Sequence, residues 1–504
     1  MKVASFGLTM VALLGTGLGA AAAQAAAALP GLSEPIEIHK GLSDKEWPQL
    51  GNTPQRTGYS PVKIAPPFEE KWRVCLSDFE VGNNILRTVQ PIVAEGKVYL
   101  GCKNGRLFAL DARSGAVEWT YVAGGAICHT AAYAEGKVFA PAMDGCVYAL
   151  GAGSGAEVWR FSNGRRYGFS TAVLLAEDRV LAVDRGGRLF CINPADGEEV
   201  WHYDAAAPVD QSPAYDDGTV FFADEHMRVH AVEAATGKRV WVSKKLPGLT
   251  FHQFWPVVVC GAVIVRPYNG AASDVAWSSD RYRRYRDRAG WKDPVTQTLV
   301  LLDEKTGEEW PAVEHYDIGM MSGPPPPPAV TRDGLLVSRW TGGYLDPKDK
   351  HVPGGGQLTS SPWNGHIWAL QDIRNQGEVI TLLEPDYVGH AVGRDELGKV
   401  IAVGIGPPDE TTVNSVLGDL VTSIISMGWR NYGEGGKGLL RTHYSRAHGI
   451  YSLEGQRWHW EGISEASMWA NTFSGGVSAV SGADGRFYNV SYNWVQCHGS
   501  ANEE

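Results

Sequence analysis

A unit of about 40 residues recurs along the first half of this chain, and each copy ends in a tryptophan. One copy begins at Pro91 and holds two apolar runs separated by a glycine turn, then Gly115 and Trp119. The same order returns with Trp159, Trp201 and Trp241, at steps of 40, 42 and 40 residues. A fixed period of this length is typical of repeat architectures, in which each copy is one supersecondary unit.

The pattern inside each copy predicts four short antiparallel strands, here called A to D from the inside outwards. Short apolar runs are separated by turns such as Glu95-Gly96, Asn104-Gly105 and Ser114-Gly115. The 61 glycines and 18 tryptophans among 504 residues fit a turn-rich, all-β chain. Because a four-stranded unit cannot bury both of its faces alone, we expect the copies to stack radially as the blades of a β-propeller.

One glycine and one tryptophan in each copy are predicted to be structural. The glycine permits the sharp turn from strand C to strand D, and the tryptophan covers the seam with the neighbouring blade. These residues are Gly115, Gly155, Gly197, Gly237 and Gly307, with Trp119, Trp159, Trp201, Trp241 and Trp310.

Insertions interrupt the later copies. Blade five is expected from Trp255 to Trp310. Two strands are expected in blade six at residues 335–338 and 366–370, two in blade seven at 400–403 and 449–453, and two in the last blade at 477–480 and 486–490. Residues 71–74 would complete the last blade and close the ring, which removes unpaired sheet edges. The prediction is an eight-bladed propeller over residues 71–496, with seven blades as the alternative, an N-terminal extension over 28–70 and a C-terminal tail over 497–504.

The N-terminus predicts export. Lys2 precedes an apolar stretch that continues to about residue 23, followed by small residues suited to cleavage. We therefore expect a signal peptide over residues 1–27 and a periplasmic or secreted protein, the alternative being an uncleaved membrane anchor. No later stretch is long and apolar enough to cross a bilayer. Seven widely spaced cysteines define no disulfide framework, and most are expected to be small buried apolar residues.

Charge and motifs exclude several classes of function. The net charge of −11 disfavours nucleic acid, because binding to a phosphate backbone requires clustered lysine and arginine. The sequence holds no C-x-x-C pair, no H-E-x-x-H and no phosphate-binding glycine loop, so it predicts no metal site and identifies no catalytic residue.

The repeat A-x-D-x-x-x-G-x-x-x-W, preceded by the segments 47–52 and 56–61, resembles the pyrroloquinoline-quinone-like β-propeller superfamily over about residues 45–496. One branch of that superfamily contains quinoprotein alcohol and glucose dehydrogenases. The other contains non-catalytic propellers, including a periplasmic lipoprotein that helps to assemble outer-membrane β-barrel proteins. The resemblance to the dehydrogenases would imply two adjacent cysteines under the quinone, and this sequence has no such pair. Nor does a lipid-attachment cysteine follow the apolar stretch, so the resemblance implies the superfamily and neither branch.

Three insertions are expected on one face of the propeller, because B-to-C loops and D-to-A loops emerge on the same side. They cover residues 269–297, 341–365 and 406–448, in blades five, six and seven. The first is expected to form a helix that presents Arg281 and Arg284 to an anion or to solvent. The second is an expected ordered loop with Trp363 and His366. The spacing of apolar residues from Val416 to Ile425 predicts an amphipathic helix in the third.

Polar and aromatic residues in the D-to-A loops are expected to line a funnel on that face, suited to a sugar or another polar ligand. They are Arg87, His129, Tyr167, Asp210, Gln211, His252, Trp255 and Asn471. The sequence thus predicts an exported binding or scaffolding protein for a protein, peptide or polysaccharide, with no cofactor, rather than an enzyme. The alternative is a quinoprotein oxidoreductase that acts on alcohols or sugars and requires pyrroloquinoline quinone with calcium.

Overall fold

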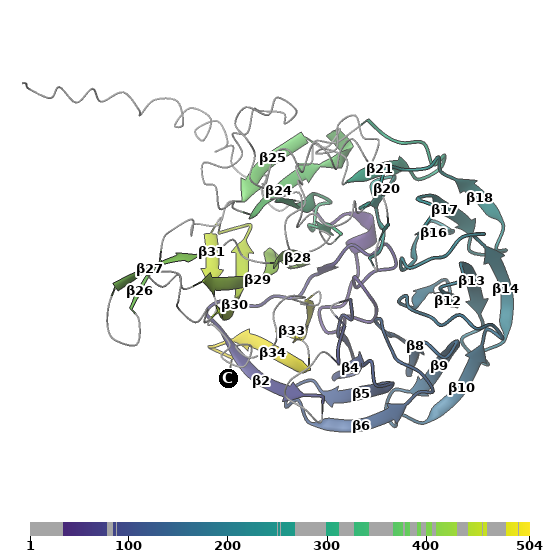
Figure 1. Ribbon diagram of the computed structural model, residues 1–504, viewed down its shortest axis with the longest axis horizontal. Coiled ribbons are helices and arrows are strands. Elements are labelled where there is room, and N and C mark those ends of the chain that lie inside the picture. Colours follow the sequence, from purple (N-terminus) through teal and green to yellow (C-terminus); the bar gives the residue numbers. More distant parts are fainter. Residues whose placement is uncertain are drawn as a thin grey trace, which may run out of the picture.

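The computed structural model describes residues 34–503 except 78–83, 87, 249, 252–253, 268–298, 312–326, 342–365, 376–377, 384–390, 395–399, 406–409, 431–441, 456, 461–479 and 492. Eight antiparallel sheets follow one another around a ring (Figure 1), which confirms the predicted eight-bladed propeller. The signal-peptide region, Arg87, His252, Arg281, Arg284, Trp363 and Asn471 lie outside the described residues.

The first four blades are regular, and each has a short inner strand of three residues. They comprise β3 (Ile92–Ala94), β4 (Lys97–Gly101), β5 (Arg106–Asp111) and β6 (Val117–Val122); β7 (Ala132–Ala134), β8 (Lys137–Pro141), β9 (Cys146–Gly151) and β10 (Glu157–Ser162); β11 (Leu174–Ala176), β12 (Arg179–Val183), β13 (Arg188–Ile192) and β14 (Glu199–Asp204); and β15 (Ala214–Asp216), β16 (Thr219–Ala223), β17 (Val229–Glu233) and β18 (Arg239–Val242).

Blades five and six carry the first two insertions, whereas the described residues of 406–448, which were expected as a third insertion between strands B and C, belong to strands of blade seven itself. The three blades comprise β19 (Val257–Val259), β20 (Ala262–Val265) and β21 (Val300–Asp303); β22 (Ala329–Val330), β23 (Leu336–Thr341), β24 (His366–Asp372) and β25 (Glu378–Leu383); and β28 (Glu410–Leu417), β29 (Leu420–Arg430), β30 (Thr442–Ser452) and β31 (Arg457–Trp460). A further hairpin, β26 (Ala391–Arg394) and β27 (Val400–Ile405), joins the end of β29. The described residues also include two short 3₁₀ helices, η1 (Glu37–His39) and η3 (Ile373–Asn375).

The two ends of the chain share the eighth blade and so close the ring. Its inner three strands are β32 (Ser481–Ala483), β33 (Arg486–Ser491) and β34 (Trp494–Ser500), and its outer strand is β2 (Phe68–Cys75) from the N-terminal side. Seven residue pairs join β2 to β34, which leaves no open gap between the first and last blades. The expected propeller end at residue 496 falls inside β34, which continues to Ser500 because this strand is the pairing partner of β2.

Each regular seam is covered by a tryptophan that docks on a glycine of the next blade. The indole of Trp119 lies against Gly155, where an added Cβ would approach Cδ2 to 2.7 Å, and the indole N–H donates to the Ala152 carbonyl at 2.9 Å. The docking glycines have φ between 69° and 79°, a conformation that suits glycine. The equivalent pairs are Trp72 with Gly115, Trp159 with Gly197, Trp201 with Gly237, and Trp241 with Gly307. Trp72 thus closes the ring in the same way, a role that the repeat pattern did not reveal.

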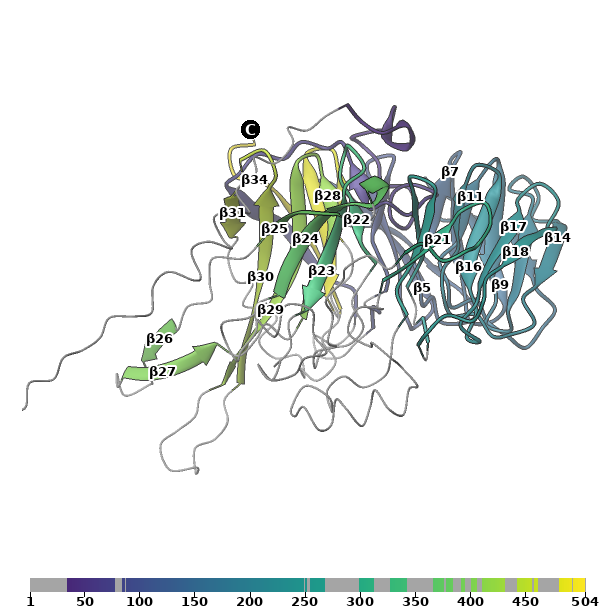
Figure 2. The same cartoon turned by 90° about the horizontal axis from the view of Figure 1, so that it is seen from above.

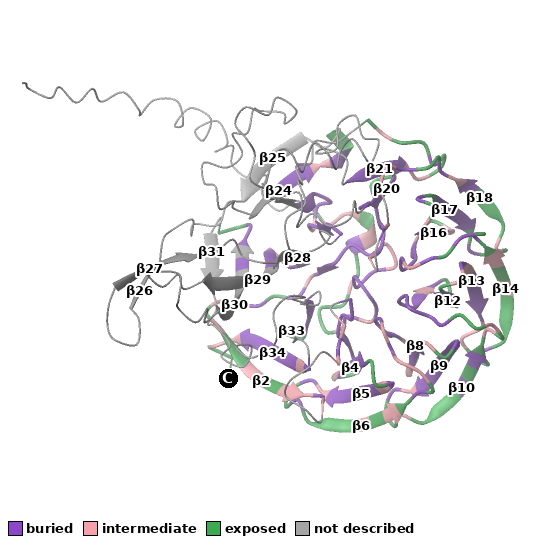
Figure 3. Cartoon of the chain, viewed as in Figure 1, coloured by how far each residue is buried: buried purple, intermediate pink, exposed green. Residues whose placement is uncertain are grey.

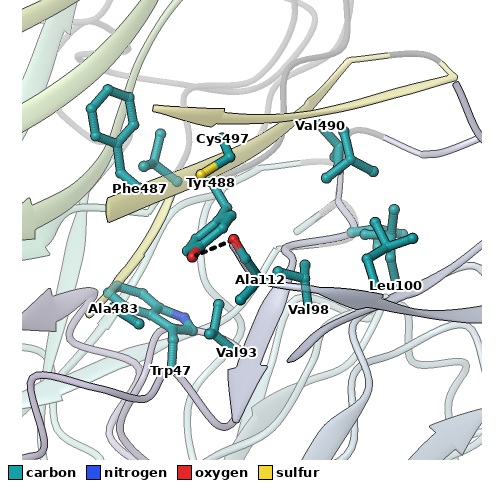
Figure 4. Packing of buried hydrophobic residues seen from close by; sticks show 14 of the residues in the cluster. Trp47, Val93, Val98, Leu100, Ala112, Ala483, Phe487, Tyr488, Val490 and Cys497 are labelled. Atoms are coloured by element: carbon teal, nitrogen blue, oxygen red, sulfur yellow. Dashed lines mark hydrogen bonds between the residues drawn. The ribbon is translucent and has the colours of Figure 1, made fainter. Parts of the chain in front are cut away.

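Burial follows the radius of the disc. Inner strands are buried and the outer strands β6, β10, β14 and β18 present alternate residues to solvent (Figure 3). The largest apolar cluster joins the N-terminal segment to blades one and eight (Figure 4). In it Trp47 is fully buried, and the Tyr488 hydroxyl donates to the Ala112 carbonyl at 3.3 Å. The ring closure therefore has an apolar core of its own.

Residues 47–60 bind the inner strand of one blade after another in chain order. Their backbone and side-chain hydrogen bonds join Trp47 to Val93, Pro48 to Tyr133, Gln49 to Leu175, Pro54 to Tyr215, Gln55 to Val258, Thr57 to Val330 and Gly58 to Val416. Strand β1 (Tyr59–Ser60) ends this run by pairing in parallel with β28. The N-terminal segment lies at one face of the disc, and β29 and β30 extend at the other (Figure 2).

A single arginine holds the centre of this segment. Arg56 is completely buried and donates to the carbonyls of Pro213, Leu50 and Val173 at 2.7–3.2 Å, and to the Gln49 amide oxygen at 3.3 Å. Burial lowers its pKa to about 9. Because its partners come from blades three and four as well as from the segment, Arg56 ties residues 47–60 to the ring.

The prediction of a helix in the third insertion is wrong. Residues 410–430 form the β28–β29 hairpin, and Gly418 makes its turn with φ +62°. Val400–Val403 correspondingly lies in β27, outside the four-stranded ladder of blade seven. The spacing of three and four that predicted a helix arises because two apolar strand ends, Val416-Leu417 and Leu420-Val421, flank a two-residue turn.

The inner strand of the last blade is also displaced from its expected position. It is β32 at Ser481–Ala483, whereas Val480 precedes the strand and 477–479 lie outside the described residues. Strand β33 agrees with the expected run at 486–490. A strand with the sequence serine–glycine–alanine carries little apolar signal of its own. It is buried because side chains of neighbouring strands cover it, and an added Cβ on Gly482 would lie 2.4 Å from the Leu417 side chain.

Candidate functional site

A cavity of about 500 Å³ lies between blades two, three and four. Its walls come from the B-to-C turns and the D-to-A loops of these blades. The lining residues are Met143, Arg166, Tyr167, Gly168, Arg185, Pro208, Val209, Asp210 and Glu225. The cavity therefore opens on the face at which strand B of each blade connects to strand C.

Backbone hydrogen bonds between neighbouring loops build the walls of the cavity. The amide of Arg185 in a B-to-C turn donates to the Gly168 carbonyl at 3.0 Å, and the amide of Glu225 donates to the Pro208 carbonyl at 2.8 Å. Gly168 allows this approach, because a Cβ there would lie 2.4 Å from the Met143 carbonyl oxygen. The lining side chains are therefore held on a repeated scaffold.

Two arginines and two acidic residues give the cavity its charge. Arg166 and Arg185 are exposed, and in the described part of the chain neither guanidinium has a hydrogen-bond or ion-pair partner. The Ser170 hydroxyl donates to Oδ1 of Asp210 at 2.8 Å. Glu225 is half-buried, and its Oε1 has no hydrogen-bond partner. Burial raises the pKa of Glu225, and the nearby charge of Asp210 adds to the rise.

Two of the predicted ligand-binding residues line this cavity, Tyr167 and Asp210. Tyr167 is 44% exposed, and the guanidinium carbon of Arg165 lies 5.2 Å from its ring centre. The Arg165 guanidinium also pairs with Asp184 at 2.9 Å, which fixes the cation beside the ring. An exposed aromatic face braced in this way can stack on a flat or apolar part of a ligand.

Three other predicted residues are buried in the scaffold. The Gln211 amide oxygen accepts the Ala223 amide at 2.9 Å, and Trp255 belongs to an apolar cluster between blades five and six. His129 is fully buried, where its Nδ1 accepts the Thr130 amide at 2.9 Å and its Nε2 lies 3.2 Å from the Ser212 hydroxyl. These contacts are structural. His366 begins β24, at the edge of the second insertion.

The sequence reasoning missed Arg166, Arg185 and Glu225. It considered the D-to-A loops and gave little weight to the three-residue B-to-C turns of the regular copies. The sequence nevertheless indicated these residues. B-to-C turns and D-to-A loops were expected on one face, so charged residues in the turns were expected to lie beside those in the loops.

The metal and thiol groups that the quinoprotein resemblance implies can be compared with the described residues. They contain no group of three or more histidine, cysteine, aspartate or glutamate side chains that could hold a metal ion. All seven cysteines lie in the described part of the chain, and each is unpaired. Burial raises the pKa of both Cys102 and Cys497 to about 12, as expected for thiols that pack as apolar side chains.

Known proteins share the repeat and the ring. The family model of the outer membrane protein assembly factor BamB matches residues 69–162 and 143–276. The quinoprotein glucose dehydrogenase of Escherichia coli (strain K12) is 32% identical over 95 residues, which cover 17% of this chain and only 12% of that enzyme. No helix in the described residues is long and apolar enough to span a membrane.

One solved structure shares the architecture. Quinohemoprotein alcohol dehydrogenase from Comamonas testosteroni aligns with a TM-score of 0.57 at 14% identity, over 96% of this chain and 84% of that one. BamB from Moraxella catarrhalis aligns with a TM-score of 0.46 at 15% identity, over 86% of this chain and 99% of that one. The repeat, the family model over residues 69–276 and the short quinoprotein match support the resemblance to the pyrroloquinoline-quinone-like β-propeller repeat superfamily, and the alcohol dehydrogenase structure shares the fold.

Proposed function

We propose that the chain is an exported binding protein that holds a ligand in the cavity of blades two to four. The single observation that carries this proposal is the cavity of about 500 Å³, which is of the size of small-molecule sites. An exposed aromatic ring and charged groups converge in it on loops fixed by a rigid ring. The N-terminal segment lies at the opposite face (Figure 2), so a ligand would enter from the face of the B-to-C turns.

Binding can be tested with glycan and peptide arrays. We expect the wild-type protein to retain a subset of the probes, and Tyr167→Ala to lose them, because the ring lies in the wall of the cavity. Tyr215→Phe is a control at an aromatic residue of blade four, outside the cavity lining. Array binding that Tyr167→Ala leaves unchanged would contradict a site in this cavity.

Export can be tested in cells that express the full chain. Cleavage near residue 27 would give a periplasmic or secreted protein with a shortened N-terminus, measured by fractionation and intact mass. A full-length protein confined to the cytoplasm would contradict the export part of the proposal. The match to an outer membrane assembly factor supports it.

The second candidate, a quinoprotein oxidoreductase, is favoured by the match to quinoprotein glucose dehydrogenase. Against it stand the absence of adjacent cysteines in the sequence and the poor fit of the described residues to a calcium site. The test adds pyrroloquinoline quinone and calcium to the purified protein and records the absorption spectrum and dye reduction with alcohols and sugars. Stoichiometric uptake with turnover would replace the binding function by this one.

A further inference from the structure

The charges of the cavity are separated by blade. Arg166 follows the outer strand of blade two and Arg185 lies in the B-to-C turn of blade three. Asp210 follows the outer strand of blade three and Glu225 lies in the B-to-C turn of blade four. One side of the cavity is therefore cationic and the other acidic.

The two sides do not neutralise each other. Burial raises the pKa of Glu225, and the nearby charges of Asp210 and Asp224 add to the rise, whereas hydrogen bonds from Thr250 and the Phe251 backbone oppose it. Arg166 and Arg185 make no ion pair in the described part of the chain, as noted above. Two guanidiniums without partners can bind a carboxylate through paired hydrogen bonds. Asp210 and Glu225 both line the cavity, and their carboxylates are of the charge that an ammonium group requires.

Apolar and aromatic side chains lie among these charges. Met143, Tyr167, Pro208 and Val209 all line the same cavity. A ligand that used only the charged groups would leave this surface bare, whereas an apolar side chain on the ligand would cover it.

We propose that the cavity binds a small dipolar molecule with a carboxylate at the Arg166 and Arg185 side and an ammonium at the Asp210 and Glu225 side, namely an α-amino acid with an apolar side chain. This inference rests on the proposed binding function and narrows its ligand class. A neutral sugar would supply no charge to either wall, and a simple anion would meet the acidic wall.

The test is isothermal titration at pH 7 with three probes: L-phenylalanine, N-acetyl-L-phenylalanine and L-phenylalanine methyl ester. The acetyl group removes the ammonium charge and the ester removes the carboxylate charge, while the ring is retained. We expect L-phenylalanine to bind, and each blocked form to bind at least about 10-fold more weakly, since one charge-assisted contact is lost.

Two pairs of matched variants locate the binding. Arg185→Gln and Glu225→Gln should each weaken binding by about 10-fold or more. Arg239→Gln and Glu308→Gln carry the same changes at exposed positions outside the cavity lining, and should leave binding unchanged. Thermal midpoints of all four variants report whether the fold is kept.

The outcomes separate the two proposals. Absence of L-phenylalanine binding, or equal binding of the blocked forms, would overturn the dipolar ligand. If an array probe is nevertheless retained and lost in Tyr167→Ala, the binding function stands and only the ligand class falls. If neither the array nor the titration shows binding in the cavity, both proposals fall.

Discussion

Trp159 illustrates how a single residue stabilises the interface between two neighbouring blades. Its indole N–H donates to the Pro194 carbonyl at 3.0 Å, and its ring lies against Gly197 of the next blade. Trp159→Ala should lower the free energy of unfolding by about 3–5 kcal/mol, because a large buried ring is lost. Trp159→Phe should cost less, since most of the ring remains. Urea denaturation measures both, with Val158→Ala as the control at a half-exposed neighbour. Equal midpoints for the alanine variants would contradict the docking role.

A single residue, Glu304, makes the free energy of unfolding depend on pH. Burial raises its pKa to about 7, and the charges of Asp216 and Asp217 add to the rise. The folded state therefore binds this proton more tightly than the unfolded chain, in which the pKa is about 4.5. The stabilisation is fully present below pH 4.5 and is lost as the pH rises through 7.

Glu304→Gln should remove this dependence. The amide can still hydrogen-bond to Asp216, and the backbone carbonyl of residue 304 still accepts the Trp241 indole N–H. We expect the variant to have a higher melting temperature than the wild type at pH 8, and the difference to shrink towards pH 5. Glu308→Gln, at an exposed glutamate of the same turn, is the control. A difference that grows towards acid pH would show that the sign is wrong.

At the scale of elements, a substitution at Gly418 distinguishes the observed hairpin from the helix that the surrounding sequence predicted. In a helix, Gly418→Ala would stabilise by up to about 1 kcal/mol. In the β28–β29 turn the same change should destabilise, because φ is +62° and a Cβ would lie 2.8 Å from the Val62 carbonyl oxygen. Thermal unfolding gives the sign directly. Ala substitution at Gly136, whose turn is open but also has positive φ, separates the backbone effect from the clash.

The regular elements could be predicted because local and global signals agree in them. In blades one to four, alternating runs, glycine turns and tryptophan spacing all repeat, so strand and seam positions followed from the sequence. The pattern was ambiguous in blade seven, where two apolar strand ends around one glycine imitate helical spacing. It was weak in β32, a strand of small residues whose burial comes entirely from neighbours. The cavity could not be predicted from local sequence, because its lining residues are up to about 80 positions apart and only the folded ring brings them together.

For the whole molecule, the decisive contact joins residues more than 400 positions apart. Strand β2 pairs with β34, and Val74 lies opposite Val495. The indole ring of Trp72, which is partly buried, packs on Gly115 and links the same strand to blade one, so both neighbours of the closing strand are fixed. An open ring would leave two sheet edges exposed, and the stability of the first and last blades would then depend on their own small cores.

Closure can be locked by a disulfide between Val74→Cys and Val495→Cys. Directly opposed residues of an antiparallel pair are close enough for this bond. Because the bond would join the two ends of the propeller and close a very long loop, the oxidised double variant should gain about 2–4 kcal/mol over its reduced form. Non-reducing electrophoresis reports the crosslink and thermal unfolding reports the gain, with each single cysteine variant as a control for mispairing with the native thiols. A double variant that stays reduced in mild oxidant, while the single variants fold normally, would place β2 away from β34 in solution and contradict the closed ring.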